Sequence, residues 1–515
     1  MNHPQQVSAG RYVLIATIFA SAMAFLESSV LNVALPAIQR ELAASSADLL
    51  WIANVYTLML GALILVGGSL GDRYGRVAVF RAGIVIFTIG NVLCGLAPTT
   101  ALLIGARVVQ GVGGALMIPG SLAIISANFS GDERGKAIGT WSAATTIATL
   151  MGPGLGGFLA DLGLWRVSFF ALVPLALVSL WALRRVPESR NERIHAPLDV
   201  PGIALITLAL GGIVFGATEI GREGIAGFQN PLNLITLAGG IALFGAFIAV
   251  ERRSPAPLVT LSLFRSSTFS RLNMLTFLLY GALGVIIFFL PLNLQQAQGY
   301  SATEAGLAFL PFSLLLATLS RPVGRWSDRI GAQRPLLIGC TLVGIACLLL
   351  AQDGPDGAAH YFTSYFPGIL ALGLGMAFVV APLTSSVMGS VPQSSAGVAS
   401  GINNAVSRTA GVLFIAVLGG LALLLHNSSL ATATTAVSQG LSASTSAAML
   451  AAPPSFVPTE ALLLTAGDES GVVAELYRRS FSSAYALVMG ICGALAWVAG
   501  FAFSRVQKTA VPAAD

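Results

Sequence analysis

Fourteen long apolar runs divide the sequence, and this feature constrains the fold more than any other. A bilayer core about 30 Å thick needs roughly 20 helical residues at 1.5 Å each, and most runs are about that long. Charge clusters and turn residues separate the runs, which cover approximately residues 12–33, 51–70, 77–97, 101–124, 138–160, 167–183, 201–218, 232–250, 274–293, 305–319, 335–350, 366–387, 397–425 and 482–503. The pattern predicts an all-α polytopic membrane protein with fourteen transmembrane helices.

Composition supports a membrane location. Hydrophobic residues make up 55% of the chain and charged residues only 10%, whereas soluble domains carry about 25% charged residues. A transmembrane β-barrel is excluded because its strands alternate apolar and polar positions over about ten residues. The four cysteines lie in apolar runs and no CxxC or HExxH motif occurs, so we expect neither a disulfide framework nor a metal site.

The basic residues predict the orientation of the chain. If the N-terminus is cytoplasmic, 20 of the 27 basic residues fall in inward-facing segments and five in outward-facing loops. Such a bias places both termini in the cytoplasm of a multi-pass protein of the inner (cell) membrane, and it requires an even number of spans. It also accounts for most of the net charge of +5, so no nucleic-acid partner is expected.

Two segments have alternative interpretations. The first run resembles a secretory signal only superficially, because it is too long, contains Glu27 and reaches Pro36 without a cleavage site. We therefore interpret it as a retained helix. The segment of about 427–479 is rich in Ala, Ser and Thr, and its composition favours a poorly ordered external loop over a partner-binding element.

A short Gly/Asp/Arg motif occurs twice, at the ends of the second and tenth runs. The first copy contains Gly68, Asp72, Arg73, Gly75 and Arg76, and the second contains Gly324, Asp328, Arg329 and Gly331. A carboxylate in such a turn can pair with arginine or cap the next helix, which predicts a conformational switch between helices. An ordinary positive-inside turn would explain the arginines, but not the repeated aspartate and glycine.

These motifs, in a chain predicted to be a helical bundle, resemble the major facilitator superfamily. The segment that includes Glu27, Asn32 and Pro36 looks like the first-helix motif of its 14-helix drug:proton antiporter family, the EmrB/QacA type. That motif usually has Asp where this chain has Glu27. The change keeps the charge and lengthens the side chain by one methylene group.

The fourth run contains Arg107 and Gln110 in a segment similar to the fourth-helix motif of that family. The resemblance implies that Arg107 takes part in proton coupling. A buried arginine in a bilayer needs a cavity or a partner, and Glu27 is the only acid clearly inside a run. We therefore predict that Glu27 and Arg107 act together, the alternative being a purely structural ion pair.

The fifth run resembles the motif that distinguishes antiporters from symporters in the superfamily. Its residues are Gly152, Pro153, Gly156 and Gly157. Small residues beside a proline give a bare, kinked face on which helices can approach closely and move. The resemblance implies export.

The resemblance also implies the domain organisation. Residues 1–185 would form an N-terminal six-helix half, 186–255 a linker with two inserted helices, and 256–515 a C-terminal half. The residues that we expect to line the substrate cavity are Asn32, Tyr56, Gln110, Tyr280, Gln295, Asn403, Asn404 and Arg408. For the polar group at 403–408, hydrogen bonding between helices is an equal alternative.

The sequence therefore predicts a secondary active transporter that exports lipophilic drugs or toxic compounds by proton antiport and alternating access. No GxxxxGK[ST] motif occurs, so ATP is not the expected energy source. We expect no enzyme activity and no cofactor beyond the proton gradient. The expected partners are a small substrate, protons and lipid, and a periplasmic adaptor stays open. The alternatives are an exporter dedicated to one endogenous siderophore, antibiotic or lipid, or a non-transporting membrane sensor.

Overall fold

The computed structural model describes residues 3–189, 199–255, 257–352, 360–392, 395–436, 441–452 and 455–504, and in these ranges it contains helices and no strand. The helices of the first part are α1 (His3–Leu42), α2 (Ser46–Tyr74), α3 (Arg76–Leu96), α4 (Thr100–Asn128), α5 (Gly131–Asp161), α6 (Trp165–Phe170) and α7 (Leu172–Leu183). Next come α8 (Val200–Glu223), the turn η1 (Gly224–Phe228) and α9 (Pro231–Glu251).

The second part begins with the turn η2 (Leu261–Arg265), α10 (Ser267–Leu292) and the turn η3 (Asn293–Ala297). It continues with α11 (Ala302–Ala308), α12 (Leu310–Ile330), α13 (Gln333–Leu350), α14 (Tyr361–Gly389), α15 (Ala396–Ala436), α16 (Ala443–Ala451), α17 (Glu460–Ala466), η5 (Gly467–Glu469) and α18 (Ser470–Ser504). Within the described ranges, fourteen helical segments are long and apolar enough to cross a membrane. The predicted number of transmembrane helices is confirmed.

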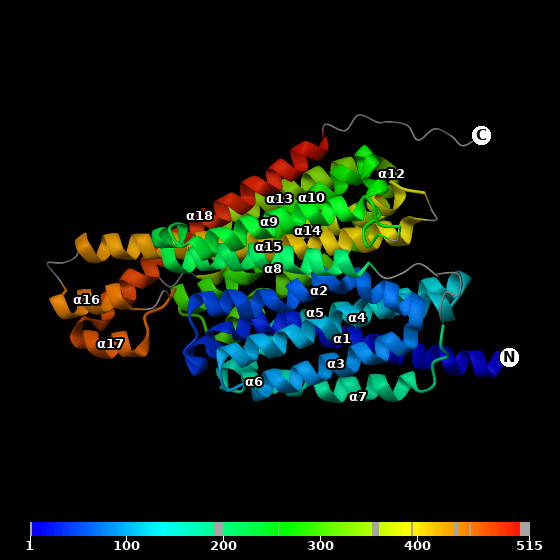
Figure 1. The fold of residues 1–515 in the computed structure, drawn as a ribbon, viewed down its shortest axis with the longest axis horizontal. Coiled ribbons are helices and arrows are strands. Elements are labelled where there is room, and N and C mark those ends of the chain that lie inside the picture. Colours follow the sequence, from blue (N-terminus) through cyan, green and yellow to red (C-terminus); the bar gives the residue numbers. More distant parts are fainter. Residues whose placement is uncertain are drawn as a thin grey trace.

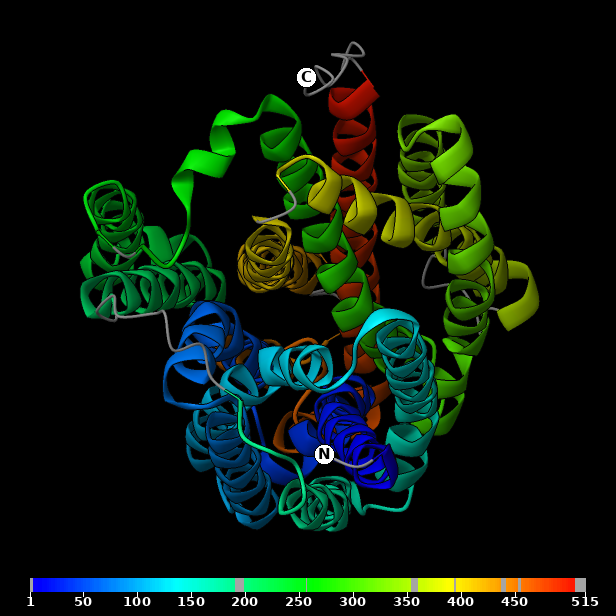
Figure 2. The same cartoon turned by 90° about the vertical axis from the view of Figure 1, so that its right-hand side faces the viewer.

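The long helices lie side by side along the longest axis of the molecule (Figure 1). Helix α1 begins and α18 ends at the same end of the bundle, which we call the terminal end; the other is the far end. Figure 2, viewed from the terminal end, shows α1–α7 as one group and α10–α18 as another. Helices α8 and α9 lie at one side of these groups.

Local sequence signals fix where several helices begin. Ser45 accepts a hydrogen bond from the Asp48 backbone while the Asp48 carboxylate accepts one from the Ser45 backbone, which forms a capping box at the start of α2. Ser301 and Glu304 form the same arrangement at the start of α11. Each box pairs backbone N–H groups that a helix start otherwise leaves unpaired.

Two predicted spans are interrupted. The sixth span consists of α6 and α7 with a break at Ala171, and the tenth consists of α11 and α12 with a break at Phe309. Pro311 lies in the first turn of α12, where a missing backbone N–H costs nothing. Apolarity alone shows neither break, because apolar residues lie on both sides of each.

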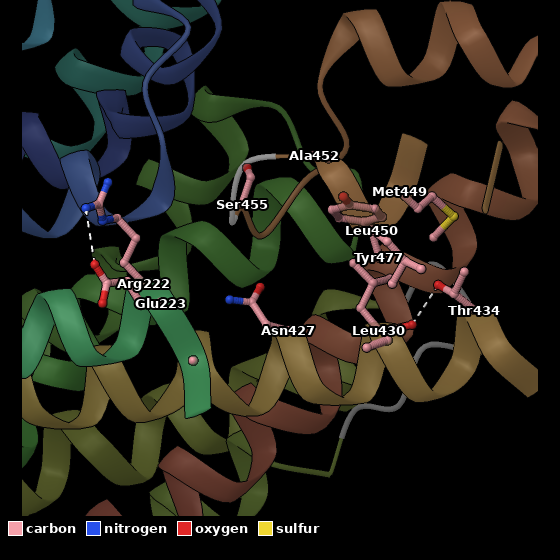
Figure 3. A pocket seen from close by; sticks show the side chains of 12 residues that line it. Arg222, Glu223, Asn427, Leu430, Thr434, Met449, Leu450, Ala452, Ser455 and Tyr477 are labelled. Carbon is pink, nitrogen blue, oxygen red and sulfur yellow. Dashed lines mark hydrogen bonds and ion pairs between the residues drawn. The ribbon is translucent and has the colours of Figure 1, made fainter. Parts of the chain in front are cut away.

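The prediction of a poorly ordered loop at about 427–479 is wrong. Helix α15 continues to Ala436, α16 and α17 follow, and α18 begins at Ser470, well before the predicted start of the last span. Apolar side chains that the Ala/Ser/Thr composition concealed form a small core of their own, which includes Leu430, Met449, Leu462 and Tyr477. A pocket lies between this core and the turn after α8, lined by Arg222, Glu223, Asn427, Leu430, Met449 and Tyr477 among others (Figure 3).

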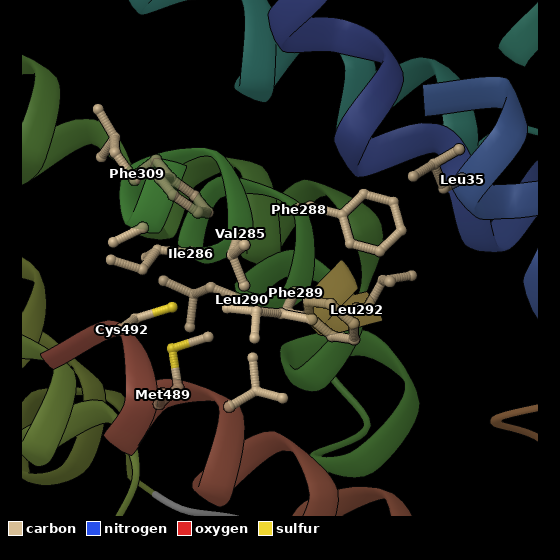
Figure 4. Close-up of a cluster of buried hydrophobic side chains, with 14 of the residues drawn as sticks. Leu35, Val285, Ile286, Phe288, Phe289, Leu290, Leu292, Phe309, Met489 and Cys492 are labelled. Atoms are coloured by element: carbon tan, nitrogen blue, oxygen red, sulfur yellow. The ribbon is translucent and has the colours of Figure 1, made fainter. Parts of the chain in front are cut away.

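The largest core lies in the second group of helices and extends to the first. In Figure 4, Phe289 of α10 lies among apolar side chains that include Met489 and Cys492 of α18, and Leu35 of α1 approaches from the first group. All four of these side chains are fully buried. The two groups of helices are thus packed together through apolar contact as well as through the polar contacts described below.

Helix α8 is packed against both groups rather than standing apart. Its Leu210 and Val214 lie in one apolar cluster with Leu58 of α2 and Val412 of α15. A Cβ atom on Gly221 would lie 2.3 Å from the Cα of Gly420 in α15, so the two backbones are in direct contact. The inserted helix pair therefore touches the α2–α15 junction.

Candidate functional site

Arg107 and Glu27 form a buried ion pair between α4 and α1. The Arg107 Nη1 donates to Glu27 Oε1, and each side chain is only 1% exposed. Arg107 Nε also donates to the Ile52 backbone carbonyl of α2 at 3.0 Å. The predicted pair is thus brought together, and the arginine joins three helices of the first group.

A chain of polar side chains extends from this pair. Gln110 Oε1 accepts from Arg107 Nη1 at 2.7 Å, and Gln110 Nε2 donates to Asn91 Oδ1 of α3 at 3.0 Å. The guanidinium of Arg107 lies over the Tyr56 ring, 4.7 Å from its centroid, a favourable cation–π position. Gln110 is hydrogen-bonded to Arg107, and Tyr56 lies against it. Both side chains therefore support the ion pair.

The second carboxylate oxygen of the pair has a different environment. Glu27 Oε2 is buried and has no hydrogen-bond partner. A buried acceptor without a partner costs roughly 1–3 kcal/mol. Protonation of Glu27 would make one of its oxygens a hydrogen-bond donor and would remove the negative charge that pairs with Arg107.

Arg408 lies on α15, next to Gly61 of α2. A Cβ atom on Gly61 of α2 would lie 3.6 Å from Arg408 Cβ, so the two groups of helices meet here. Arg408 Nε donates to Asn404 Oδ1 at 3.0 Å. Among the described residues no carboxylate pairs with Arg408. Asn404 is exposed.

Other predicted cavity residues are placed differently. Asn403 Nδ2 donates to Asn273 Oδ1 at 3.1 Å and to Thr276 Oγ1 at 2.7 Å, which joins α15 to α10 as the alternative interpretation had it. Asn32 Nδ2 donates to the Ser28 carbonyl one turn earlier in α1. Tyr280 is half-buried on α10.

Gln295 belongs to a set of contacts that closes the far end. Gln295 Nε2 donates to the Val33 carbonyl at 3.0 Å, and Gln296 Nε2 donates to Gln39 Oε1 at 2.8 Å. Gln39 in turn donates to Ser455 Oγ at 3.2 Å. Within the described ranges, the hydrogen bonds that join α1–α7 to α10–α18 all lie at this end. The bundle is thus tied together at the far end.

The glycine motif of α5 lies at the same junction. Cβ atoms on Gly152 and Gly156 would meet α1, at 2.0 Å from Ser29 Oγ and 2.7 Å from the Val30 carbonyl. A Cβ atom on Gly157 would lie 2.2 Å from the Ala302 carbonyl of α11. The predicted bare face therefore packs against one helix of each group.

Pro153 takes part in the same contact through its backbone. A Cβ atom on Gly306 of α11 would lie 2.1 Å from the Pro153 carbonyl oxygen. Asp161, at the end of α5, accepts hydrogen bonds at 2.8 Å from the backbone N–H groups of Ala302 and Thr303. A carboxylate at a helix start is favourable, so Asp161 fixes α11 against α5.

The repeated motif lies at the terminal end, and its copies differ. Asp72 Oδ1 pairs with Arg76 at 2.7 Å, whereas Asp328 has no ion pair among the described residues, because Ala332 stands at the position four residues later. Arg73 and Arg329, which the motif also singled out, lie in the last turns of α2 and α12. Gly68 is a close neighbour of Pro119 in α4.

The start of α3 is capped by a residue that the motif did not indicate. Glu188 accepts hydrogen bonds at 2.9 Å from the backbone N–H groups of Val77 and Ala78. Gly75 precedes them with φ 111°, and a Cβ atom there would lie 2.7 Å from the Glu188 carboxyl carbon. Only glycine suits this position. Asn91, Asp161 and Glu188 were therefore missed, since each acts through a partner that is distant in sequence.

Comparison with known proteins decides the family. The sequence profile described as Major Facilitator Superfamily matches residues 17–416 of the chain. The chain belongs to the major facilitator superfamily. It is accordingly a multi-pass membrane transporter of small molecules, as the resemblance implied.

Several named relatives of this superfamily member are drug or antibiotic resistance proteins. It is 37% identical over 412 residues to the multidrug resistance protein Stp of Mycobacterium tuberculosis (strain CDC 1551 / Oshkosh), covering 79% of this chain and 74% of that one. It is 32% identical over 407 residues to the tetracenomycin C resistance and export protein of Streptomyces glaucescens, with coverages of 79% and 74%.

A solved structure supports the fold. A bacterial homolog of the human lysosomal transporter Spinster, in an inward-facing and unoccupied conformation, aligns with a TM-score of 0.68 at 16% identity, covering 99% of this chain and 100% of that one. At this identity the likeness concerns the fold alone. The major facilitator fold predicted for the chain is confirmed.

Proposed function

We propose that this protein exports lipophilic small molecules, drugs among them, across the inner (cell) membrane in exchange for protons. The observation that carries the proposal is the buried Glu27–Arg107 pair, whose second carboxylate oxygen has no partner. The names of the relatives, which include multidrug resistance and antibiotic export, support the direction and the substrate class. The proton gradient is the energy source, and no further cofactor is needed.

The coupling step takes place at Glu27. In the ionised form it neutralises Arg107 and leaves the interior with the charge of Arg408 alone. Protonation removes that compensation, so the polar chain through Tyr56 experiences a second positive charge. A buried ion pair that loses one partner is destabilised by about 3–5 kcal/mol, which is enough to change the preferred arrangement of the helices.

The far-end contacts define the starting state of the cycle. With both termini in the cytoplasm, the far end faces outward, and the closed contacts of Gln39 and Asp161 correspond to an inward-facing transporter. Substrate enters from the cytoplasm or the inner leaflet. The halves then separate at the far end and release it, as alternating access requires.

Everted membrane vesicles test the coupling. A preformed pH gradient is established in vesicles that contain the wild type, Glu27→Gln or Glu27→Asp, and compounds from a panel of lipophilic drugs are added. In the wild type a transported compound should dissipate the gradient. Glu27→Gln should abolish the response because the amide cannot exchange a proton, whereas Glu27→Asp restores the residue typical of the related family and should keep it.

The outcomes separate the possible mechanisms. Coupling that persists in Glu27→Gln would remove Glu27 from the mechanism. A response to one compound of the panel and no other would identify a dedicated exporter. Substrate-dependent growth protection with no effect on the pH gradient would refute proton antiport while leaving export in place.

A further inference from the structure

Two buried carboxyl groups at the terminal end are not used by the transport mechanism above. Asp199 immediately precedes α8, and Glu251 is the last residue of α9. Their exposed fractions are only 7% and 3%. They frame the inserted helix pair, one at its entrance and one at its exit, although they are far apart in sequence.

In each carboxyl group, one oxygen accepts a hydrogen bond from a backbone N–H group. Asp199 Oδ1 accepts from the Gly202 backbone at 2.9 Å and caps α8. Glu251 Oε2 accepts from the Val259 backbone at 2.9 Å, which ties the connection between α9 and α10 to the end of α9. These contacts hold both side chains in place.

The two remaining oxygens lie close to the same glycine, Gly202. Asp199 Oδ2 and Glu251 Oε1 are both buried and without a hydrogen-bond partner. A Cβ atom on Gly202 would lie 2.7 Å from Glu251 Oε1 and 2.9 Å from Asp199 Oδ2, so both oxygens lie around one point above this glycine. The absence of a side chain at Gly202 leaves them the space to meet.

One shared proton would give both of these buried acceptors a hydrogen-bond partner. If both groups were ionised, two buried negative charges would repel each other, and each would keep an unsatisfied oxygen. One proton between the oxygens removes a charge and gives both oxygens a hydrogen-bond partner, as in paired carboxyl groups that share a proton. Metal cations such as Ca²⁺ take 6–8 oxygen ligands, many more than two.

No positive charge in the described neighbourhood replaces that proton. Arg252 and Arg253 follow Glu251, but both are exposed and neither forms an ion pair with the two carboxyl groups. On α2, which packs against α8, Asp72 is paired with Arg76 of α3, and Arg73 lies over the Tyr74 ring. On α15, Arg408 is bonded to Asn404, and the charged residues of α8 itself, Glu219, Arg222 and Glu223, lie at its far end.

We propose that Asp199 and Glu251 form a second proton-binding site, separate from Glu27, which holds the base of the inserted helix pair together through one shared proton. In the protonated state the start of α8, the end of α9 and the connection at Val259 are joined. Loss of the proton leaves two repelling carboxylates and loosens this junction. Because α8 also contacts α2 and α15, the site links proton occupancy to the packing of the inserted pair against both halves.

The purified full-length protein in detergent tests the proposal without any substrate. Thermal unfolding is measured across a range of pH for the wild type, Glu251→Gln, Asp199→Asn and the control Glu219→Gln. Near neutral pH the carboxyl groups of the unfolded chain are ionised, whereas the proposed site in the folded protein holds one proton. Folding of the wild type therefore takes up one proton. The folding equilibrium should therefore fall about tenfold per pH unit over the range in which the unfolded chain has released this proton and the folded site still holds it, and level off once the site deprotonates.

The amide variants should lose this dependence. In Glu251→Gln the amide N–H₂ donates to Asp199 Oδ2 at every pH, so the midpoint temperature should match that of the wild type at low pH and stay constant as pH rises. Asp199→Asn is the reciprocal variant, since asparagine still caps α8. Glu219→Gln alters a far-end ion pair and should follow the wild-type pH curve.

Infrared spectroscopy provides the direct readout. The C=O stretching band of a protonated carboxylic acid should be present near neutral pH in the wild type and in Glu27→Gln, and should disappear in Glu251→Gln. A wild type with no such band and with the pH profile of Glu251→Gln would overturn the proposal. So would a Glu251→Gln variant that is more stable than the wild type at every pH, or a requirement for Na⁺ in place of the proton.

Discussion

Replacement of Gly157 by alanine should open the far end of the bundle. The new Cβ atom would lie 2.2 Å from the Ala302 carbonyl oxygen, well inside van der Waals contact. A small shift of α11 along α5 is restrained, because the backbone N–H groups of Ala302 and Thr303 donate to Asp161 at 2.8 Å. The overlap is therefore relieved only by separating α5 from α11, which is the movement that opens this end.

The expected size of the effect follows from these contacts. Overpacking by a methyl group costs typically about 1–3 kcal/mol, and a state in which the far end is open does not bear that cost. A bias of about 2 kcal/mol changes the ratio of closed to open molecules by about thirtyfold, since each 1.36 kcal/mol is tenfold. Gly154→Ala is the matched control, because its Cβ atom would meet only the end of the Leu307 side chain, at 3.4 Å.

Thiol labelling measures this ratio. All four native cysteines are buried, so a single reporter, Val33→Cys, can be placed in the closed far-end contact, where Val33 is 2% exposed. The labelling rate should rise by about thirtyfold with Gly157→Ala and stay unchanged with Gly154→Ala. A Gly157→Ala protein that is folded and is labelled at the wild-type rate would refute the reasoning.

Three further predictions compare the effects of single substitutions. Asp72→Asn should lower transport with a loss of stability below about 1 kcal/mol, because a partly exposed ion pair contributes little, whereas Asp328→Asn, which breaks no ion pair, should leave thermal stability unchanged. Phe456→Ala should destabilise the purified protein by about 3–5 kcal/mol in thermal unfolding, since Phe456 is 1% exposed, whereas Leu464→Ala at a 76% exposed position should not. Arg408→Gln should lower the KM for monocationic substrates and leave that for uncharged ones unchanged, as transport assays with matched compound pairs can show.

The fold could be predicted because hydrophobic length is a local property. A run of about 20 apolar residues predicts each transmembrane helix. A superfamily motif such as the one at Gly152 is likewise recognised from residues that are neighbours in the sequence. The same reasoning failed at 427–479, where helices form around a small apolar cluster that includes Leu430 and Tyr477. Composition alone does not reveal a small core that assembles from short amphipathic pieces.

The site was predictable where charge is scarce. Glu27 and Arg107 were identified because a bilayer tolerates few ionised groups and each needs compensation. Asn91 could not be found in this way, because an amide is common enough in helices that only its hydrogen bond to Gln110 distinguishes it. Glu188 was hidden for the opposite reason, since it lies among other charged residues after the sixth span and its role depends on the start of α3.

The buried charges also restrict the substrates that the proposed antiport can serve. In the proposed mechanism, uptake of a proton by Glu27 adds one positive charge beside Arg107. Arg408 contributes another, since no carboxylate of the described residues pairs with it. A cationic substrate is therefore repelled when the proton binds, and by reciprocity the substrate opposes the proton, which is the coupling that antiport needs. An anionic substrate would bind more tightly with the proton, so the two would travel together. The arrangement thus favours exchange of protons for cationic or uncharged lipophilic compounds, with Arg408 limiting how tightly the cations bind.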